Sequence, residues 1–111
     1  MIKQPGKKND ETKNRWDLVP FEVMDEFVKR FTHGAIKYNE NPDDPNYLKL
    51  PDAKNRYFSG LCRHLSAYRQ GEVFDPDAPN LTHIGAVMWN AAILCYFELE
   101  KIKLSKKDAQ E

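Results

Sequence analysis

An excess of charge of one sign is absent from this sequence, and so are long apolar runs. Seventeen Lys and Arg residues balance seventeen Asp and Glu residues among 111. The composition therefore favours neither nucleic acid nor an acidic macromolecule as a partner. No apolar run approaches the roughly 20 residues that span a bilayer, and no signal-peptide pattern opens the chain. We therefore expect a cytoplasmic protein with no membrane and no nucleic-acid partner.

Cysteine is also scarce. Only Cys62 and Cys95 are present, and neither has a second thiol at the spacing of a metal site. Both fall on apolar faces of predicted helices, which indicates reduced thiols in a hydrophobic core. The length suits a single domain with one core.

Hydrophobic periodicity predicts two helices in the first two thirds of the chain. The first opens at Pro20, and its apolar residues share one arc up to a break expected near His33 and Gly34. A proline-rich loop follows. The second helix takes Asp52 as its N-cap and stops at Gly71.

The third predicted helix runs from about Leu81 to Lys103, with Asn80 as its cap. It is apolar nearly all round as far as Phe97, which is typical of a buried, central helix. We see no alternating strand pattern. The sequence therefore predicts an all-α fold, a compact bundle of three to four helices around this C-terminal helix. Residues 1–15 are expected to be a flexible tail, 16–103 the single domain, and 104–111 a polar C-terminal tail.

Ionisable residues gather at the end of the second helix. Arg63 and His64 lie within it, and Glu72 and Asp75 follow in the loop. A half-buried histidine beside a surface arginine would explain the first pair without any ligand. The two carboxylates have two equally weighted interpretations. They are charged residues that merely follow a helix end, or they bind a metal or a ligand, since loops often carry functional residues.

The other two helices carry further candidates. His83 and Asn90 share one stripe of the last helix, two turns or about 10 Å apart. A buried amide such as Asn90 needs partners, either the backbone of a neighbouring helix or a ligand. Lys37 and Tyr38 follow Gly34 by one turn, where a phosphate or a base could bind.

Acidic residues of the first helix could hold Mg²⁺, since Glu22, Asp25 and Glu26 lie within about one turn. Ion pairs at i,i+4, Asp25 with Lys29 and Glu26 with Arg30, explain them better as a solvated outer face.

The order of these motifs resembles one family. The chain resembles the N-terminal domain of bacteriophage dATP/dGTP diphosphohydrolases in four successive motifs. They are RWDLVP, FTHGAIKY, RHL with GEVFD, and His83 followed after six residues by Asn90. These enzymes are relatives of MazG-type pyrophosphohydrolases. The resemblance covers about Arg15 to Glu100, and it rests on the order and spacing of the motifs together.

The resemblance implies a nucleotide-binding domain that hydrolyses a nucleoside triphosphate to a monophosphate and pyrophosphate. Lys37 and Arg63 would contact phosphates, and Tyr38 would stack on the base or close the pocket. The implied catalytic acid and base are His64 and His83, the ligand-binding residues Asp17, Lys37, Tyr38, Arg63 and Asn90, and the Mg²⁺ ligands Glu72 and Asp75.

Two departures from the family pattern leave another function open. Ala86 stands where the family's H-L-x-H motif has its second histidine, and the loop before His83 is altered to DPDAPNLT. The two-helix carboxylate arrangement of MazG-type enzymes is also missing. The alternative is a non-catalytic binder that sequesters a nucleotide-derived defence signal, as an anti-defence protein would. A helical interaction module without a ligand is a third possibility.

Self-association is expected as well. A helix that is apolar nearly all round needs more cover than two other helices supply, so we expect a homodimer or a higher homo-oligomer.

Overall fold

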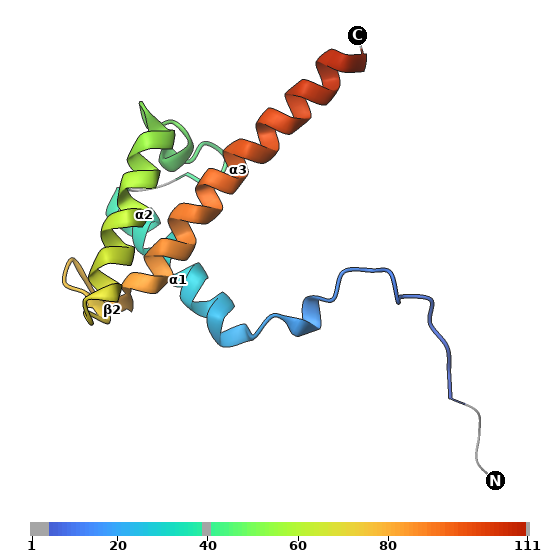
Figure 1. Ribbon diagram of the computed structural model, residues 1–111, viewed down its shortest axis with the longest axis horizontal. Coiled ribbons are helices and arrows are strands. Elements are labelled where there is room, and N and C mark those ends of the chain that lie inside the picture. Colours follow the sequence, from blue (N-terminus) through green and yellow to red (C-terminus); the bar gives the residue numbers. More distant parts are fainter. Residues whose placement is uncertain (1–4, 39–40, 111) are drawn as a thin grey trace.

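The computed structural model describes residues 5–38 and 41–110 (Figure 1). Residues 1–4 of the expected N-terminal tail, 39–40 of the expected loop and 111 of the C-terminal tail lie outside the described residues. In chain order the elements are the 3-10 helix η1 (Trp16–Leu18), α1 (Phe21–Tyr38), the 3-10 helix η2 (Asn46–Leu48), α2 (Ala53–Arg69), β1 (Phe74–Asp75), β2 (Ala78–Thr82) and α3 (His83–Gln110).

The prediction of an all-α fold is wrong, because an antiparallel hairpin stands between α2 and α3. In it, Phe74 pairs with Thr82 and Asp75 pairs with Ala78, and the register is irregular between the two pairs. The fold is therefore mixed, with three α-helices and one two-stranded sheet. The Asp75 side chain closes the turn by accepting a bond from the Asp77 amide at 2.9 Å.

The hairpin is held by α1. A carboxylate oxygen of Glu26 accepts bonds from the Thr82 amide (3.0 Å) and the Thr82 hydroxyl (2.8 Å). The Arg30 guanidinium donates to the Thr82 carbonyl at 2.7 Å and to Asp75 at 3.2 Å. The interpretation of Glu26 and Arg30 as an ion pair on a solvated face is therefore wrong: both side chains turn towards the hairpin, and Glu26 has Lys29 at 3.8 Å.

The helix ends differ in part from the prediction. α1 begins after Pro20 and continues without a break through Gly34 to Tyr38. α3 begins at His83 and continues seven residues beyond Lys103. At the start of α2, Asp52 adopts a left-handed conformation, and its side chain bonds the Asn55 amide group instead of a backbone N–H.

Gly71 ends α2 in a turn that requires glycine. Its φ of 94° lies in the left-handed region. The Gly71 amide bonds the Tyr68 carbonyl and the Glu72 amide bonds the Ala67 carbonyl, both at 3.0 Å. These two bonds form a Schellman motif, which reverses the chain and brings Glu72 back beside the helix.

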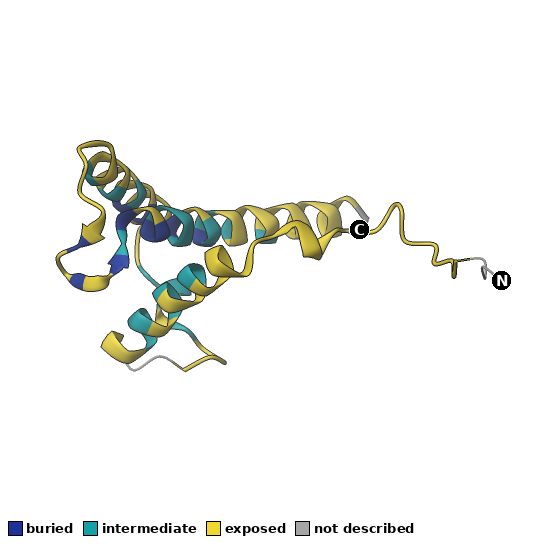
Figure 2. Cartoon of the chain, turned by 90° about the horizontal axis from the view of Figure 1, so that it is seen from below, coloured by how far each residue is buried: buried dark blue, intermediate teal, exposed yellow. Residues whose placement is uncertain are grey.

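The core is small and lies where α2, the hairpin and the first turns of α3 meet (Figure 2). Rings from four segments extend it, with Trp89 within 6.0 Å of Phe31, Tyr47 and Tyr57 between centroids. The buried apolar residues are Tyr57, Ala78, Leu81, Ala86 and Ile93.

α3 is not the enclosed centre of a bundle. α2 packs along one side of it and α1 crosses another, and its last turns extend beyond both (Figure 1). Its apolar residues Ile84, Tyr96, Leu99 and Ile102 are exposed. Cys62 and Cys95 are also exposed free thiols, so their assignment to the core is wrong. No helix of the described residues is long and apolar enough to cross a membrane.

Candidate functional site

A groove of about 870 Å³ lies between α1, α2, the hairpin and the start of α3. It brings together residues that are far apart in the sequence. Eight of the nine predicted site residues line it: Lys37, Tyr38, Arg63, His64, Glu72, Asp75, His83 and Asn90.

Asp17 is the ninth, and it is not part of this lining. It lies in η1 on an exposed segment and forms a two-pronged ion pair with Arg15, with both bonds at 2.8 Å. The bond from Arg15 lowers the pKa of the Asp17 carboxyl. In the described residues the bonds of the Asp17 carboxylate go to Arg15, and its predicted role in ligand binding stays a prediction.

Polar burial in the described residues coincides with the groove. Asp75, His83 and Asn90 are the buried polar residues, with exposed fractions of 6%, 4% and 6%, and all three line it. Burying such groups is costly unless they are bonded or serve a ligand. The buried polar residues therefore mark the groove as the candidate binding site.

His83 stands at the junction of the hairpin and α3, between two partners. Its Nε2 lies 2.6 Å from the Glu72 carboxylate, and its Nδ1 lies 2.8 Å from Nδ1 of His64. A carboxylate only accepts hydrogen bonds, so His83 carries a proton on Nε2, and in its neutral form it presents a lone pair on Nδ1. His64 then donates from Nδ1 in this arrangement.

The backbone fixes His83 as firmly as its side-chain partners do. The His83 amide donates to the Val73 carbonyl at 3.0 Å. Glu72 is delivered by the turn at Gly71, so the glycine that ends α2 also sets the orientation of the His83 ring.

His64 comes from α2 and is half-buried. Burial is the main cause that lowers its pKa; the nearby charge of Asp75 opposes this, and Arg30, His83 and Arg63 add to the lowering. The imidazole is therefore neutral at neutral pH, with a lone pair available to a ligand or a proton.

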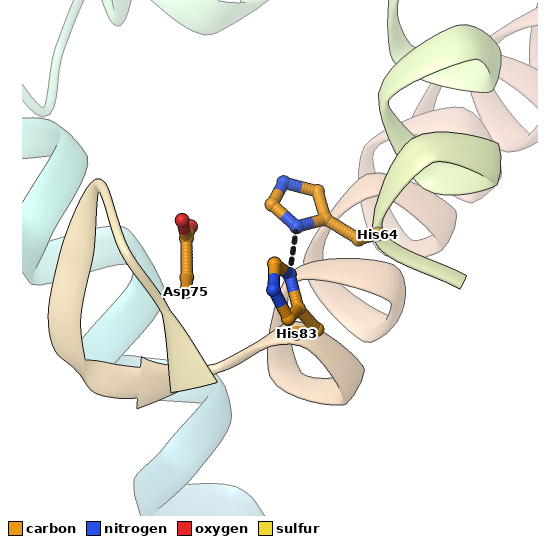
Figure 3. A group of neighbouring side chains, drawn as sticks. All are labelled: His64, Asp75 and His83. Atoms are coloured by element: carbon orange, nitrogen blue, oxygen red, sulfur yellow. Dashed lines mark hydrogen bonds between the residues drawn. The ribbon is translucent and has the colours of Figure 1, made fainter. Parts of the chain in front are cut away.

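Asp75 remains a carboxylate despite its burial. Desolvation raises its pKa, but the hydrogen bonds from the Asp77 amide and from Arg30 outweigh it, and the net shift is downwards. His64, Asp75 and His83 each offer a ligand atom, and these atoms lie within 4.8 Å of one another (Figure 3). We call these three residues the His-Asp cluster.

Glu72 and Asp75, predicted to bind a metal together, contact different partners. Asp75 joins the two histidines in the cluster, whereas Glu72 reaches it through its bond to His83. In sequence, Glu72 and Asp75 are only three residues apart, but the reversal at Gly71 and the start of β1 direct them to different partners.

A cationic wall faces the same groove, formed by Lys37, Arg56 and Arg63. Arg63 bonds the Ser59 hydroxyl at 2.9 Å, and the Lys37 ammonium lies 5.3 Å from the centre of the Tyr38 ring. Within the described part of the chain, none of the three cations has a carboxylate partner at ion-pair distance. Sequence reasoning missed Arg56, although its position two helical turns before Arg63 could have indicated it.

The Asn90 side chain on α3 lies against Gly60 of α2. Its amide nitrogen donates to the Ala86 carbonyl one turn earlier at 2.8 Å. A Cβ added to Gly60 would lie 3.0 Å from its side-chain oxygen, so glycine on α2 makes room for the amide. The amide lines the groove from this position.

Cations and metal-ligating side chains that line one groove are features by which proteins recognise small anionic ligands. The model of the family described as dATP/dGTP diphosphohydrolase, N-terminal, matches residues 3–107. The chain belongs to this family. Neither the search of curated proteins nor the search of solved structures gives a match.

Proposed function

We propose that this chain binds a purine (deoxy)nucleoside triphosphate in the groove and hydrolyses it to a monophosphate and pyrophosphate. The family description supports the substrate class, since it names dATP and dGTP. The observation that carries the proposal is that the cationic wall and the His-Asp cluster line the same groove.

The cationic wall suits the triphosphate. Lys37, Arg56 and Arg63 supply three positive charges from two helices, and charge-assisted bonds to phosphate are stronger than neutral ones. Tyr38, exposed at the end of α1, is placed to stack on the base. The phosphates then extend towards the His-Asp cluster.

The reaction needs a water molecule and a place for its proton. The water oxygen bonds to the α-phosphorus, the bond from that phosphorus to the oxygen bridging to the β-phosphate breaks, and pyrophosphate leaves. One water proton passes to an imidazole of the cluster, where His64 is neutral at neutral pH. The leaving pyrophosphate keeps its charge beside the cationic wall.

Binding and turnover are tested separately. Isothermal titration with dATP and dGTP, with and without Mg²⁺, measures affinity, and chromatography of the same samples measures monophosphate and pyrophosphate. Arg63→Ala should weaken binding by about 1.5–3 kcal/mol, the scale of a charge-assisted bond. Arg69→Ala removes an exposed arginine of the same helix outside the groove lining and should leave binding unchanged. Equal affinities of the two variants would remove Arg63 from the site.

A sequestering binder is the second candidate. The observation that favours it is Ala86, which is 2% exposed, lines the groove, and stands where the family pattern has a histidine. Such a protein would hold a nucleotide-derived defence signal for a phage in its host's cytoplasm. Tight binding of nucleotide with no product in the presence of divalent ions would favour it over hydrolysis.

A further inference from the structure

The His-Asp cluster has the composition of a transition-metal site. Two imidazoles and one carboxylate suit Zn²⁺ and its neighbours, whereas Mg²⁺ prefers ligands that are all oxygen. Only one carboxylate, that of Asp75, belongs to the cluster. The three side chains come from α2, β1 and the first residue of α3, so the fold itself assembles them (Figure 3).

The protonation state of His83 prepares it as a ligand. Its Nε2 is tied to the Glu72 carboxylate at 2.6 Å, which leaves the Nδ1 lone pair directed at His64. A carboxylate that holds the far nitrogen of a histidine in this way is the usual outer partner of a metal-bound imidazole. The two Nδ1 atoms lie 2.8 Å apart, so an ion can bind to both once the rings separate slightly and the His64 proton moves from Nδ1 to Nε2.

The charge balance also favours a cation. Asp75 and Glu72 contribute two negative charges at or next to the cluster, and Arg30 contributes one positive charge through its bond to Asp75. Asp75 is held on both oxygens, by Arg30 and by the Asp77 amide, so its carboxylate is already oriented. Burial of His83 and Asp75 shields these groups from water, which strengthens their attraction for an ion.

We infer that His64, Asp75 and His83 bind one Zn²⁺ ion per chain, with a remaining coordination position open to the groove. All three residues line the groove, so a phosphate or a water molecule can reach that position. Glu72 is a positioning residue that acts through His83. The binding of the ion stands on its own, and its use in hydrolysis rests on the proposed function. The two roles of the histidines are alternatives. In the metal-free chain an imidazole of the cluster accepts the water proton of the proposed reaction, whereas with the ion bound both histidines are ligands and that proton passes to solvent.

Titration of the chelator-stripped chain with Zn²⁺ alone tests this inference. We expect one ion per chain and a rise in melting temperature with Zn²⁺, and no comparable effect of Mg²⁺. His64→Asn and Asp75→Asn should each weaken Zn²⁺ binding at least about a hundredfold, and Glu72→Gln by about 10–100-fold. The matched control is His33→Asn, which removes the histidine that lines the groove outside the cluster and should bind Zn²⁺ like the parent chain.

Three results would overturn the inference. They are no binding of Zn²⁺ by a stripped chain that is folded by circular dichroism, unchanged binding by His64→Asn and Asp75→Asn, and a preference for Mg²⁺. Circular dichroism of each variant separates a lost ligand from a lost fold. Binding of dGTP in the absence of metal is measured in parallel. If the chain binds Zn²⁺ but no nucleotide, the proposed function is wrong and the metal site stands. If it binds nucleotide but no Zn²⁺, the metal site is wrong and the proposed function stands.

Discussion

No contact among the described residues explains why residue 34 is a glycine. It lies inside α1 in the lining of the groove, and a Cβ added there would meet no atom within 4 Å. Glycine in a helix interior costs about 1 kcal/mol relative to alanine. A ligand that comes close to the backbone of α1 would explain why this cost is tolerated.

Replacing this residue should therefore separate stability from binding. We expect Gly34→Ala to raise the free energy of unfolding by up to about 1 kcal/mol, because it improves helix propensity without a clash. We also expect it to weaken dGTP binding at least about tenfold, or about 1.4 kcal/mol. Urea unfolding and isothermal titration measure the two effects. A stabilised variant with unchanged affinity would show that the ligand does not approach α1 here.

Asn90 offers a second test at the residue scale. Its side chain bonds the Ala86 carbonyl, which also accepts the regular bond of α3, so removing the amide leaves no backbone group without a partner. Asn90→Leu should leave the melting temperature unchanged or raise it, while affinity for the nucleotide falls at least about tenfold, or about 1.4 kcal/mol. Loss of stability with full binding by the folded fraction would assign Asn90 to the scaffold.

The sequence predicted which residues line the groove better than it predicted which of them contact one another. The order of motifs grouped residues as distant as Lys37 and Asn90, because the family pattern carries information about proximity. It did not separate Glu72 from Asp75, since that depends on the left-handed turn at Gly71. Asp17 was included because of its motif, but its partner is Arg15 two residues away.

At the scale of elements, the contact between α1 and the hairpin includes one carboxylate with a shifted pKa, that of Glu26. The bond from the Thr82 amide is the main cause that lowers the pKa of Glu26 below its ordinary value of 4.5; burial opposes it, and the Thr82 hydroxyl, Lys29 and Arg30 add to the lowering. A carboxylate with a depressed pKa in the folded state contributes stability that is fully present above its unfolded pKa. That contribution is lost as the pH falls through the folded pKa.

Neutralising this carboxylate should therefore matter at neutral pH and cease to matter in acid. We expect Glu26→Gln to lower the free energy of unfolding by about 1–2 kcal/mol near pH 7, the scale of a hydrogen bond to a charged group. The difference from the parent chain should shrink as the pH falls below 4.5. Urea unfolding across this range measures it, with Glu22→Gln, on an exposed residue of α1, as the control. A difference independent of pH would contradict this account.

The hairpin could not be predicted from local pattern. β1 has two residues, and β2 includes Pro79, which strands seldom accept. Bonds with Glu26 and Arg30, about 50 residues earlier in the sequence, hold the hairpin against α1. On a single helix these two residues are four positions apart and match a surface ion pair, so the periodicity of α1 alone gave the wrong partners.

At the scale of the whole molecule, the chain is more extended than a compact domain. Its radius of gyration is 19.0 Å, against about 13 Å expected for this length. The exposed residues Tyr96, Leu99 and Ile102 follow one another at intervals of three along α3 and form an apolar stripe on it. Exposed apolar stripes often mark interaction surfaces, and we propose a second copy of this chain as the partner.

We therefore expect the protein to sediment above its chain mass of 13.0 kDa, most simply as a two-fold dimer. Leu99→Lys should shift the distribution towards the monomer, because it places a charge within the stripe. Ser105→Lys, on an exposed residue of the same helix, should not. A concentration-independent monomer of the parent chain would rule out self-association.

β2 passes into α3 with no connecting loop, so the hairpin and the first turn of α3 open together. The Thr82 amide is bonded to Glu26 and the His83 amide to the Val73 carbonyl. Exchange of these two protons with solvent therefore requires α1 to leave the hairpin or β2 to leave the segment after α2. Their protection from hydrogen exchange measures how often the site comes apart in the native ensemble.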